Sequence, residues 1–111
     1  MSNFEHLIQQ IVHFRDERDW EQFHNSKDLA LAISIEAAEL NELFLWKNAE
    51  EVDKSKLKQE LADIFTYCML LAHKHGLDVE EIVEEKLNIN AANYPIDKAK
   101  GNASKYNEFG Q

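Results

Sequence analysis

The sequence predicts an all-α protein, and three observations support this prediction. Apolar residues recur at intervals of three and four along most of the chain, which is the period of an amphipathic helix. Ser2 and Glu5 have the spacing of a helix-start capping box, and so do Asp78 and Glu81. No stretch shows the sustained two-residue alternation of a half-buried strand. We therefore expect four helices joined by polar connections.

The first helix is expected from Ser2 to about Arg18. Its apolar stripe consists of Phe4, Leu7, Ile8, Ile11 and Val12. Residues 19–25 follow as a polar connector that holds three ring side chains: Trp20, Phe23 and His24. Rings in a connector either fold onto the core or meet a ligand, and the pattern alone favours packing in the core.

The second helix is expected to begin near Ser26, a residue type that favours the N-cap, and to end at Trp46 or Lys47. Three of its apolar side chains lie outside the main stripe: Leu31, Ile35 and Leu45. A helix that is apolar on several faces is buried on several sides. In a chain of 111 residues, this predicts that a partner subunit covers one of those faces.

The third helix is expected to begin at Asp53 or Ser55 and to end at Gly76, which suits the first position beyond a helix. His73 and His75 lie in its last turn, where positive or polar groups suit the helix dipole. We therefore interpret these two histidines as structural residues and not as ligands.

The fourth helix is expected to begin at Asp78 and to end before Pro95, because the residue preceding a proline disfavours helical geometry. Lys86 and Asn90 lie one turn apart on its inward face. An inward lysine suits a phosphate or a carboxylate, and the alternative is a stem that runs along the core to solvent.

From Ile96 onward the composition changes, and lysines alternate with small and polar residues. We expect a loop or tail over residues 96–111, after a helical domain over residues 1–95. Such a tail either closes over a polyphosphate or is a solvated terminus, and composition alone favours the solvated terminus.

Two pairs of acidic residues lie where the helical pattern calls for core residues. The second helix carries Glu36 and Glu39, and the third helix carries Glu60 and Asp63. Carboxylates are rarely buried unless they are paired or bind a metal, and four on facing helices repel one another unless a cation lies between them. Carboxylate oxygens are the ligands that magnesium prefers. The pattern therefore favours a magnesium cluster over its alternative, four solvated acids on helix surfaces.

The composition limits the class of protein. A net charge of -9 argues against the basic footprint of a protein that binds DNA or RNA. The single cysteine, Cys68, forms no internal disulfide, which fits a reducing compartment. The N-terminus lacks the features of a signal peptide, and no apolar run reaches membrane-spanning length. We expect a cytoplasmic protein without a membrane segment.

The order of these motifs resembles that of the MazG-like all-α nucleoside triphosphate pyrophosphohydrolases, and in particular their dCTP pyrophosphatase branch. The two acidic pairs resemble the signature of the family. The other matching segments are 18–24 (RDWEQFH), 42–47 (ELFLWK), 86–90 (KLNIN), 94–95 (YP) and 104–106 (SKY). The resemblance extends from about Phe14 to Phe109. It implies a four-helix MazG-like bundle that forms a homodimer or homotetramer, with sites near a subunit interface and a C-terminal tail that folds toward them.

The resemblance also implies an activity and a set of site residues. The activity is Mg²⁺-dependent hydrolysis of a nucleoside triphosphate to the monophosphate and pyrophosphate, with two or more Mg²⁺ per site and Mn²⁺ as a substitute. The implied metal ligands are Glu36, Glu39, Glu60 and Asp63. Of these, we take Glu39 and Glu36 as catalytic, with Glu39 as the preferred general base. The implied phosphate or sugar contacts are Lys86, Asn90, Tyr67, Lys100, Lys105 and Tyr106, and the implied base contacts are Trp20, His24 and Trp46.

One position departs from the branch and leaves the base preference open. Relatives place a histidine on the first helix where this chain has Ile11. The leading expectation is dCTP or a related or modified deoxynucleotide, hydrolysed as house-cleaning of the nucleotide pool. One alternative is another nucleotide, such as dUTP or a histidine-pathway intermediate. The other is a non-catalytic helical module that binds a nucleotide or a metal, which the joint presence of the four acids, Lys86 and Asn90 argues against.

Overall fold

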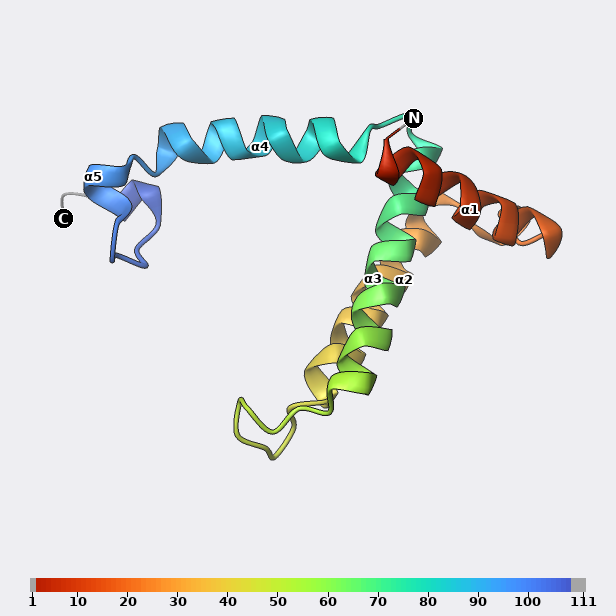
Figure 1. Cartoon of the computed structure of the whole chain (residues 1–111), viewed down its shortest axis with the longest axis horizontal. Helices are drawn as coiled ribbons and strands as arrows, with labels where there is room; N and C mark the ends of the chain where they lie inside the picture. Colours follow the sequence, from red (N-terminus) through yellow and green to blue (C-terminus); the bar gives the residue numbers. More distant parts are fainter. Residues whose placement is uncertain (1, 109–111) are drawn as a thin grey trace. The chain divides into compact units, whose positions relative to one another are not determined.

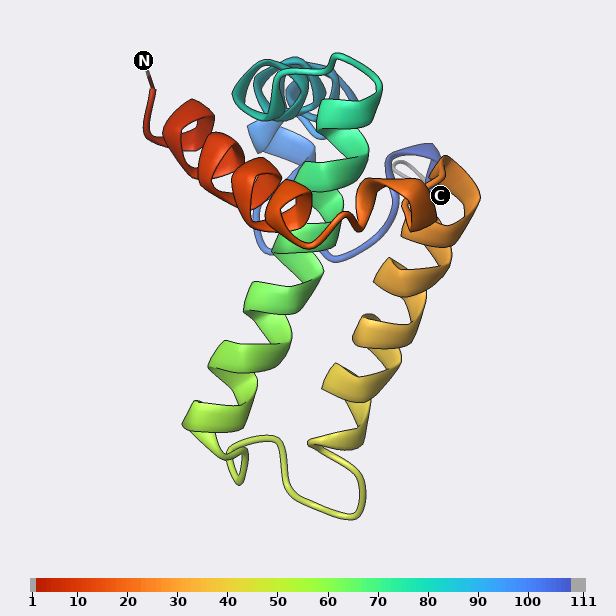
Figure 2. The same cartoon turned by 90° about the vertical axis from the view of Figure 1, so that its right-hand side faces the viewer.

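The computed structural model describes residues 2–108, and the chain divides into two units, Met1–Leu77 and Asp78–Gln111. Figures 1 and 2 show the helices of these units in the order of the sequence. Residues 2–108 consist of helices and connecting turns and contain no β-strand, which confirms the predicted all-α class. Among these residues, no helix combines the length and the apolar content that a membrane crossing requires.

The first unit begins with helix α1 (Asn3–Glu17), and its start follows the predicted capping box. The Glu5 N–H donates to the Ser2 hydroxyl at 3.1 Å, and the Ser2 N–H donates to the Glu5 carboxylate at 3.2 Å. These two bonds satisfy backbone donors that the first turn would otherwise leave unpaired.

The end of α1 determines how the connector starts. Asp19 adopts a left-handed φ of 53°, a conformation in which aspartate is enriched. The Trp20 N–H donates to the carbonyl of Arg15 at 3.1 Å, and the Asp19 N–H to that of Asp16 at 3.1 Å. This is the hydrogen-bond pattern of a Schellman turn. It reverses the chain and leads into the short 3₁₀ helix η1 (Glu21–Phe23).

Helix α2 (Ser26–Glu42) differs from the prediction at both ends. Its N-cap is Asn25 and not Ser26, because the Asn25 side-chain oxygen accepts the Asp28 N–H at 2.8 Å. The predicted continuation to Trp46 or Lys47 is wrong. The N–H groups of residues 43–45 bond to carbonyls three residues earlier, so the helix tightens and ends, and Trp46 follows with a φ of 62°.

Helix α3 (Lys54–Lys74) begins and ends close to the predicted positions. Asp53 caps its start by accepting the Ser55 N–H at 2.9 Å. Gly76 follows the helix with a φ of 67°, in the left-handed region where a glycine carries no steric penalty. His75, interpreted as structural from the sequence, lies 2.8 Å from the Ser26 hydroxyl through its Nε2 atom and so joins the end of α3 to the start of α2.

The three helices of the first unit enclose a small core. Helices α2 and α3 pack against each other along antiparallel axes, and α1 packs against α3 (Figure 2). The buried apolar side chains are Leu29, Met69, Leu70 and Ala72. Because α2 and α3 are antiparallel, Leu29 at the start of α2 lies at the same end as the last turns of α3.

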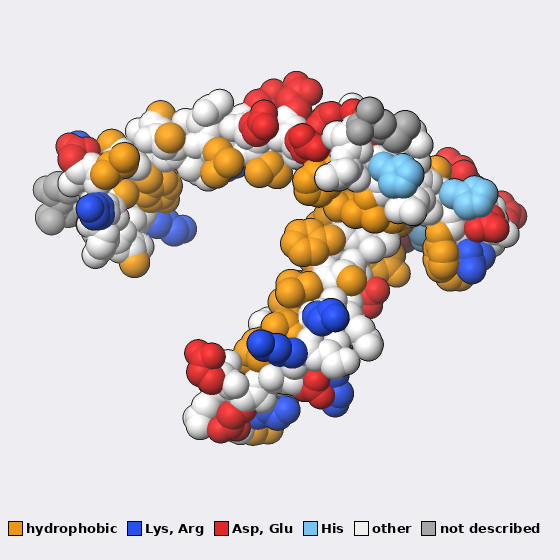
Figure 3. Space-filling model, viewed as in Figure 1, with side chains coloured by type: hydrophobic (Ala, Val, Ile, Leu, Met, Phe, Trp, Pro, Cys, Tyr) orange, Lys and Arg blue, Asp and Glu red, His pale blue; other side chains and the backbone are white. Residues whose placement is uncertain are grey.

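Many large apolar side chains remain exposed on this unit. They include Phe4, Leu7, Phe14, Leu31, Ile35 and Phe65. Leu31 and Ile35, which the pattern places outside the main stripe of α2, are 52% and 58% exposed. Figure 3 shows apolar side chains gathered at the surface of both units. Phe4, Leu7 and Phe65 line one apolar hollow, and contiguous apolar surface of this kind is typical of a protein that associates with another chain.

The second unit consists of helix α4 (Val79–Asn93), helix α5 (Ile96–Ala99) and the 3₁₀ helix η2 (Tyr106–Glu108). Asp78 caps α4 by accepting the Glu81 N–H at 3.0 Å, and α4 ends before Pro95, as predicted. The expectation that everything after Ile96 is loop or tail is wrong in part. Pro95 has a fixed φ that suits the residue before a helix, and α5 starts directly after it. Residues 109–111 of the predicted tail lie outside the described part of the chain.

Candidate metal centre and adjoining cavity

Three of the four predicted metal ligands converge between α2 and α3. Glu36 comes from α2, and Glu60 and Asp63 come from one face of α3. One carboxylate oxygen from each of the three lies within 4.8 Å of the other two. Separations of this size are those of ligands that share one cation or a small cluster of cations. The antiparallel packing of α2 on α3 therefore produces the acidic cluster that the two sequence motifs predict.

Glu39 is close to this cluster but more exposed. It lies one turn after Glu36 on α2, and its side chain is exposed, whereas Glu36 is half-buried. Its carboxylate still acts on Glu36, because it is one of the groups that raise the pKa of Glu36. The structure thus places Glu39 at the rim of the cluster formed by the other three acids.

The electrostatics of the cluster are those of a site that lacks a counter-charge. The pKa of Glu36 is raised to about 7. Burial is the largest cause, followed by interaction of the protonated carboxyl with Glu60 and Glu39, and then by repulsion from Glu39 and Asp63. Among the described residues, no ion pair between side chains involves any of these acids. Without a cation, the cluster therefore retains a proton near neutral pH.

Two buried oxygen atoms in the cluster are available to a cation. Oε2 of Glu36 and Oε2 of Glu60 are buried, and neither has a hydrogen-bond partner within residues 2–108. Leaving a buried acceptor unpaired is costly, and such groups in folded proteins generally meet a partner of some kind. Carboxylate oxygens without a protein donor are suitable ligands for a hard divalent ion such as Mg²⁺.

An aromatic cavity of about 170 Å³ adjoins the acidic cluster. Its rings are Phe14, Trp20, His24 and Tyr67, its aliphatic walls are Ile11 and Leu70, and it is completed by Arg15, Thr66 and Asp63. Asp63 belongs to both features, so one end of the aromatic cavity opens onto the candidate metal centre. Tyr67, predicted to face the phosphates, lies one turn beyond Asp63 in the wall of this cavity.

The rings of the cavity contact one another at right angles. Phe14 and Trp20 have centroids 5.9 Å apart and planes at 73°, and His24 and Tyr67 have centroids 6.5 Å apart and planes at 76°. Edge-to-face contacts of this kind are favourable. The sequence pattern predicts that the rings of the connector pack in the core. This prediction is wrong for the single chain, because Trp20 is 44% exposed and Phe23 is 62% exposed. The Schellman turn after α1 directs Trp20 to a cavity wall and not to the core.

His24 offers the cavity a polar atom. Its Nδ1 is buried and has no hydrogen-bond partner in the described part of the chain. The pKa of His24 is lowered, first by burial and then by the positive charge of Arg15. His24 is therefore neutral at physiological pH, and a neutral imidazole nitrogen is suited to a hydrogen bond with an uncharged ligand such as a base.

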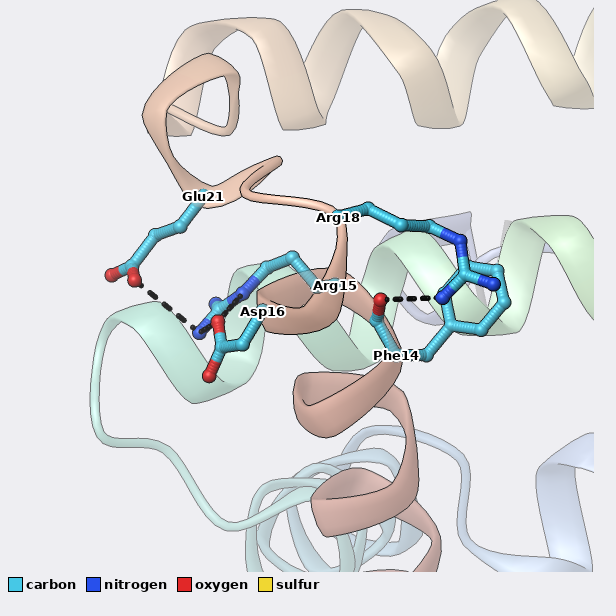
Figure 4. A network of polar contacts seen from close by, with 5 residues as sticks. All are labelled: Phe14, Arg15, Asp16, Arg18 and Glu21. Carbon is cyan, nitrogen blue, oxygen red and sulfur yellow. Dashed lines mark hydrogen bonds and ion pairs between the residues drawn. The ribbon is translucent and has the colours of Figure 1, made fainter.

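Four residues that line the cavity were not predicted from the sequence: Phe14, Arg15, Thr66 and Leu70. Arg15 is the charged one among them. Its position four residues after Ile11 on the apolar stripe of α1 was the signal that could have found it. It is buried, and its guanidinium contacts Asp16 and Glu21 (Figure 4). A buried arginine must be paired, and these two carboxylates fulfil that condition.

The remaining predicted site residues lie elsewhere. Trp46 is 95% exposed, in the turn that follows α2, and does not line the aromatic cavity. Five predicted phosphate or sugar contacts belong to the second unit: Lys86 and Asn90 on α4, Lys100 after α5, Lys105 before η2, and Tyr106 within η2. Tyr106 packs within that unit on Tyr94, with ring centroids 5.9 Å apart. The roles of these residues stay predictions.

The fold and the site together define an all-helical protein with a carboxylate cluster suited to divalent cations beside an aromatic cavity. The chain matches the MazG-like family over residues 31–109 and belongs to it.

Comparisons with individual proteins agree with this family. The chain is 39% identical over 104 residues to dCTP pyrophosphatase 1 of Bos taurus, an alignment that covers 86% of this chain and 62% of that protein. It is 38% identical to dCTP pyrophosphatase 1 of Homo sapiens, covering 86% and 61%. The chain thus spans about three fifths of the length of these relatives. Its fold is similar to that of a pyrophosphatase from Archaeoglobus fulgidus, with a TM-score of 0.79, 33% identity, and coverage of 86% of this chain and 94% of that one.

Proposed function

We propose that this protein is a Mg²⁺-dependent nucleotide pyrophosphohydrolase, which converts a nucleoside triphosphate and water to the monophosphate and pyrophosphate. The observation that supports this most directly is the convergence of Glu36, Glu60 and Asp63 at the open end of an aromatic cavity. A nucleotide presents an aromatic ring and a polyphosphate that are joined by a sugar. The site offers a cavity for a ring and a cation centre for the polyphosphate, and Asp63 connects the two.

In this proposal the acidic residues hold the magnesium ions. The carboxylates of Glu36, Glu60 and Asp63 provide the inner ligands, and Glu39 completes the set from the rim. Ions held by these residues would supply positive charge to the phosphate oxygens and would favour attack by water at the α-phosphorus. Glu39 is the proposed general base, because an exposed carboxylate at the rim keeps access to solvent water. The exchange of water for the pyrophosphate leaving group needs no nucleophile from the protein.

The polyphosphate carries several negative charges in addition to those of the acids. We propose that Lys86 and Asn90 on α4, with Lys100, Lys105 and Tyr106, contact the phosphates or the sugar. The support for this part of the proposal is their charge and hydrogen-bonding capacity, together with the motifs that they share with the family. Tyr67 lies between the proposed base site and the proposed phosphate site, because it lines the aromatic cavity one turn beyond Asp63.

The proposed substrate is dCTP or a related or modified deoxynucleotide. The names of the relatives, dCTP pyrophosphatase 1, support the cytosine base. Trp20 and His24 line the aromatic cavity, where Trp20 would stack on the base and His24 would donate or accept a hydrogen bond. Trp46 is proposed to complete the base site from another subunit of a homodimer or homotetramer, because it is fully accessible for such a contact.

The test is pyrophosphate release from a panel of canonical and modified nucleoside triphosphates, with Mg²⁺, with Mn²⁺ and with chelator. We expect metal-dependent release, strongest with a cytosine deoxynucleotide. Glu36→Gln should abolish release, whereas Glu50→Gln, which makes the same chemical change in the exposed turn between α2 and α3, should not. A folded wild-type protein that releases pyrophosphate from none of the substrates would overturn the proposal in favour of a non-catalytic binding module.

A further inference from the structure

The C-cap residue of α1, Arg18, contacts the ring of Phe14 in the last turn of that helix. Its guanidinium carbon lies 3.7 Å from the ring centroid. This is well inside the distance of about 6 Å at which a cation over an aromatic face is attracted to it. The Nη1 atom of Arg18 also donates a hydrogen bond to the Phe14 carbonyl at 3.0 Å. Figure 4 shows the guanidinium against the ring and the bond to the carbonyl, so Arg18 is held at both the side chain and the backbone of one residue.

The charge of Arg18 has no carboxylate partner. Among residues 2–108, no ion pair includes this residue. The acids nearest to it in the sequence contact other side chains: Asp16 contacts Arg15, Glu17 contacts His13, and Asp19 contacts Gln22. A guanidinium is flat and weakly hydrated, and it therefore stacks readily on an aromatic face. The side chain of Arg18 is thus committed to Phe14.

The contact with Arg18 matters for Phe14 because the rest of the protein confines this ring only in part. Phe14 is 51% exposed. Exposed side chains change rotamer within nanoseconds unless something holds them. Arg18 lies over the ring, and its hydrogen bond to the Phe14 carbonyl keeps it there. The contact therefore restricts the orientations that the Phe14 ring can adopt.

The Phe14 ring in turn contacts the ring of Trp20 edge to face. Both rings line the aromatic cavity, whereas Arg18 does not. Trp20 is 44% exposed, and among residues 2–108 it makes no other contact with an aromatic ring. The orientation of the Trp20 ring therefore depends on Phe14 and, through Phe14, on Arg18.

We propose that Arg18 is a positioning residue of the base site: it holds the Phe14 ring, and this ring keeps Trp20 in the orientation in which it stacks on the base. This inference rests on the proposed function, since it assigns the aromatic cavity to the base. Arg18 acts from outside the cavity by preorganisation. A wall that is already ordered loses less conformational freedom when a ligand binds.

The test is a double-mutant cycle between Arg18 and Phe14. The four proteins are the wild type, Arg18→Met, Phe14→Leu and the variant with both changes. Values of kcat and KM are measured with Mg²⁺ for dCTP, or for the best substrate of the panel. Arg18→Met should raise KM by about two- to fivefold, the worth of a cation–π contact at an exposed site, and should change kcat less. In the Phe14→Leu background it should have little further effect, because the ring through which Arg18 acts is gone.

A matched control separates the contact with the ring from the charge alone. Lys27→Met removes a charge of the same sign from an exposed position on α2. It should leave KM unchanged. Should Arg18→Met fail to fold by circular dichroism, Arg18→Leu replaces it in the cycle.

A second measurement does not depend on turnover. The indole resonances of Trp20 are recorded by NMR in metal-free protein, and those of Trp46 are identified with Trp46→Phe. Arg18→Met should shift the Trp20 resonances, because a reoriented Phe14 ring changes the ring current that they experience. The shift should be much smaller in the Phe14→Leu background. If the wild type hydrolyses no triphosphate, the proposed function fails while this comparison still tests whether Arg18 positions Trp20.

Two results would overturn the inference. The first is an unchanged KM, or unchanged Trp20 resonances, in folded Arg18→Met protein. The second is an equal rise of KM on Arg18→Met in the wild-type and Phe14→Leu backgrounds, because Arg18 would then act on the nucleotide through its charge and not through the ring of Phe14.

Discussion

Replacing Glu36 by glutamine should make the metal-free protein more stable at alkaline pH and leave its stability at acid pH unchanged. The pKa of Glu36 is raised from 4.5 in the unfolded chain to about 7 in the folded protein. The folded state therefore binds more protons than the unfolded state between these two values. Its free energy of unfolding falls as pH rises through this window, and the full loss is present above pH 7.

The size of the effect follows from the pKa shift and from the exposure of the neighbouring acids. One pKa unit corresponds to about 1.4 kcal/mol, so the shift of Glu36 is worth about 3 kcal/mol without screening. Burial is the largest cause of the shift, but Glu36 is only half-buried and the neighbouring Glu39 and Asp63 are exposed, so solvent screening reduces the effect to about 1 kcal/mol. Glutamine cannot ionise and resembles the protonated carboxyl. Glu36→Gln should therefore gain about 1 kcal/mol at pH 8, or roughly 4 °C in Tm for a domain of this size.

The assay is thermal unfolding by circular dichroism in chelator at pH 4 and pH 8, at one protein concentration because association shifts Tm. The two proteins should have equal Tm at pH 4, where Glu36 is protonated in both states. Addition of Mg²⁺ at pH 8 should raise the Tm of the wild type and have much less effect on the variant. A Glu36→Gln protein that is less stable than the wild type at pH 8 in chelator would refute the assignment of Glu36 to a repulsive, cation-binding cluster.

Three further outcomes are expected. Trp20→Ala should raise KM more than it lowers kcat in steady-state assays, because stacking of a base on an aromatic ring is worth about 1–3 kcal/mol; an unchanged KM would remove Trp20 from the base site. Leu29→Ala should lower the free energy of unfolding by about 2–5 kcal/mol in urea titrations, because Leu29 is buried, with 2% of its surface exposed. The matched control is Leu31→Ala, on the exposed side of the same helix. Sedimentation equilibrium should show a dimer or tetramer, and a monomer at all concentrations would contradict the proposed partner subunit.

The elements of the fold that could be predicted are those fixed by local chemistry. Ser2 and Asp78 cap helices through side-chain bonds that a few neighbouring residues determine, and Gly76 ends α3 because its backbone adopts a positive φ. The acidic cluster was predictable for a related reason. Residues three apart on a helix share a face, and two such pairs on apolar stripes must come together when the stripes pack.

The errors occur where the decisive interaction lies outside the local pattern. The predicted end of α2 is too late because the apolar residues of the pattern continue to Trp46. In the structure, the N–H groups of residues 43–45 bond to carbonyls three residues earlier, and this spacing ends the α-helix before Trp46. Arg15 was missed because its position on the apolar stripe is only part of the signal, and its burial also requires charged partners that the helical pattern does not show. Its partners are Asp16, which is adjacent, and Glu21, which reaches it only after the chain reverses at Asp19.

The exposed apolar residues connect the fold to the proposed site. A core of four buried apolar side chains is small for a first unit with three helices, and Leu31, Ile35 and Phe65 expose more than half of their surface. Apolar burial supplies most of the free energy of folding, so a unit that leaves these residues exposed gains considerable stability from association. Leu31 and Ile35 lie on the same helix as Glu36 and Glu39. A subunit that covered this surface of α2 would therefore also determine how far solvent reaches the acidic cluster, and both stability and metal affinity should depend on protein concentration.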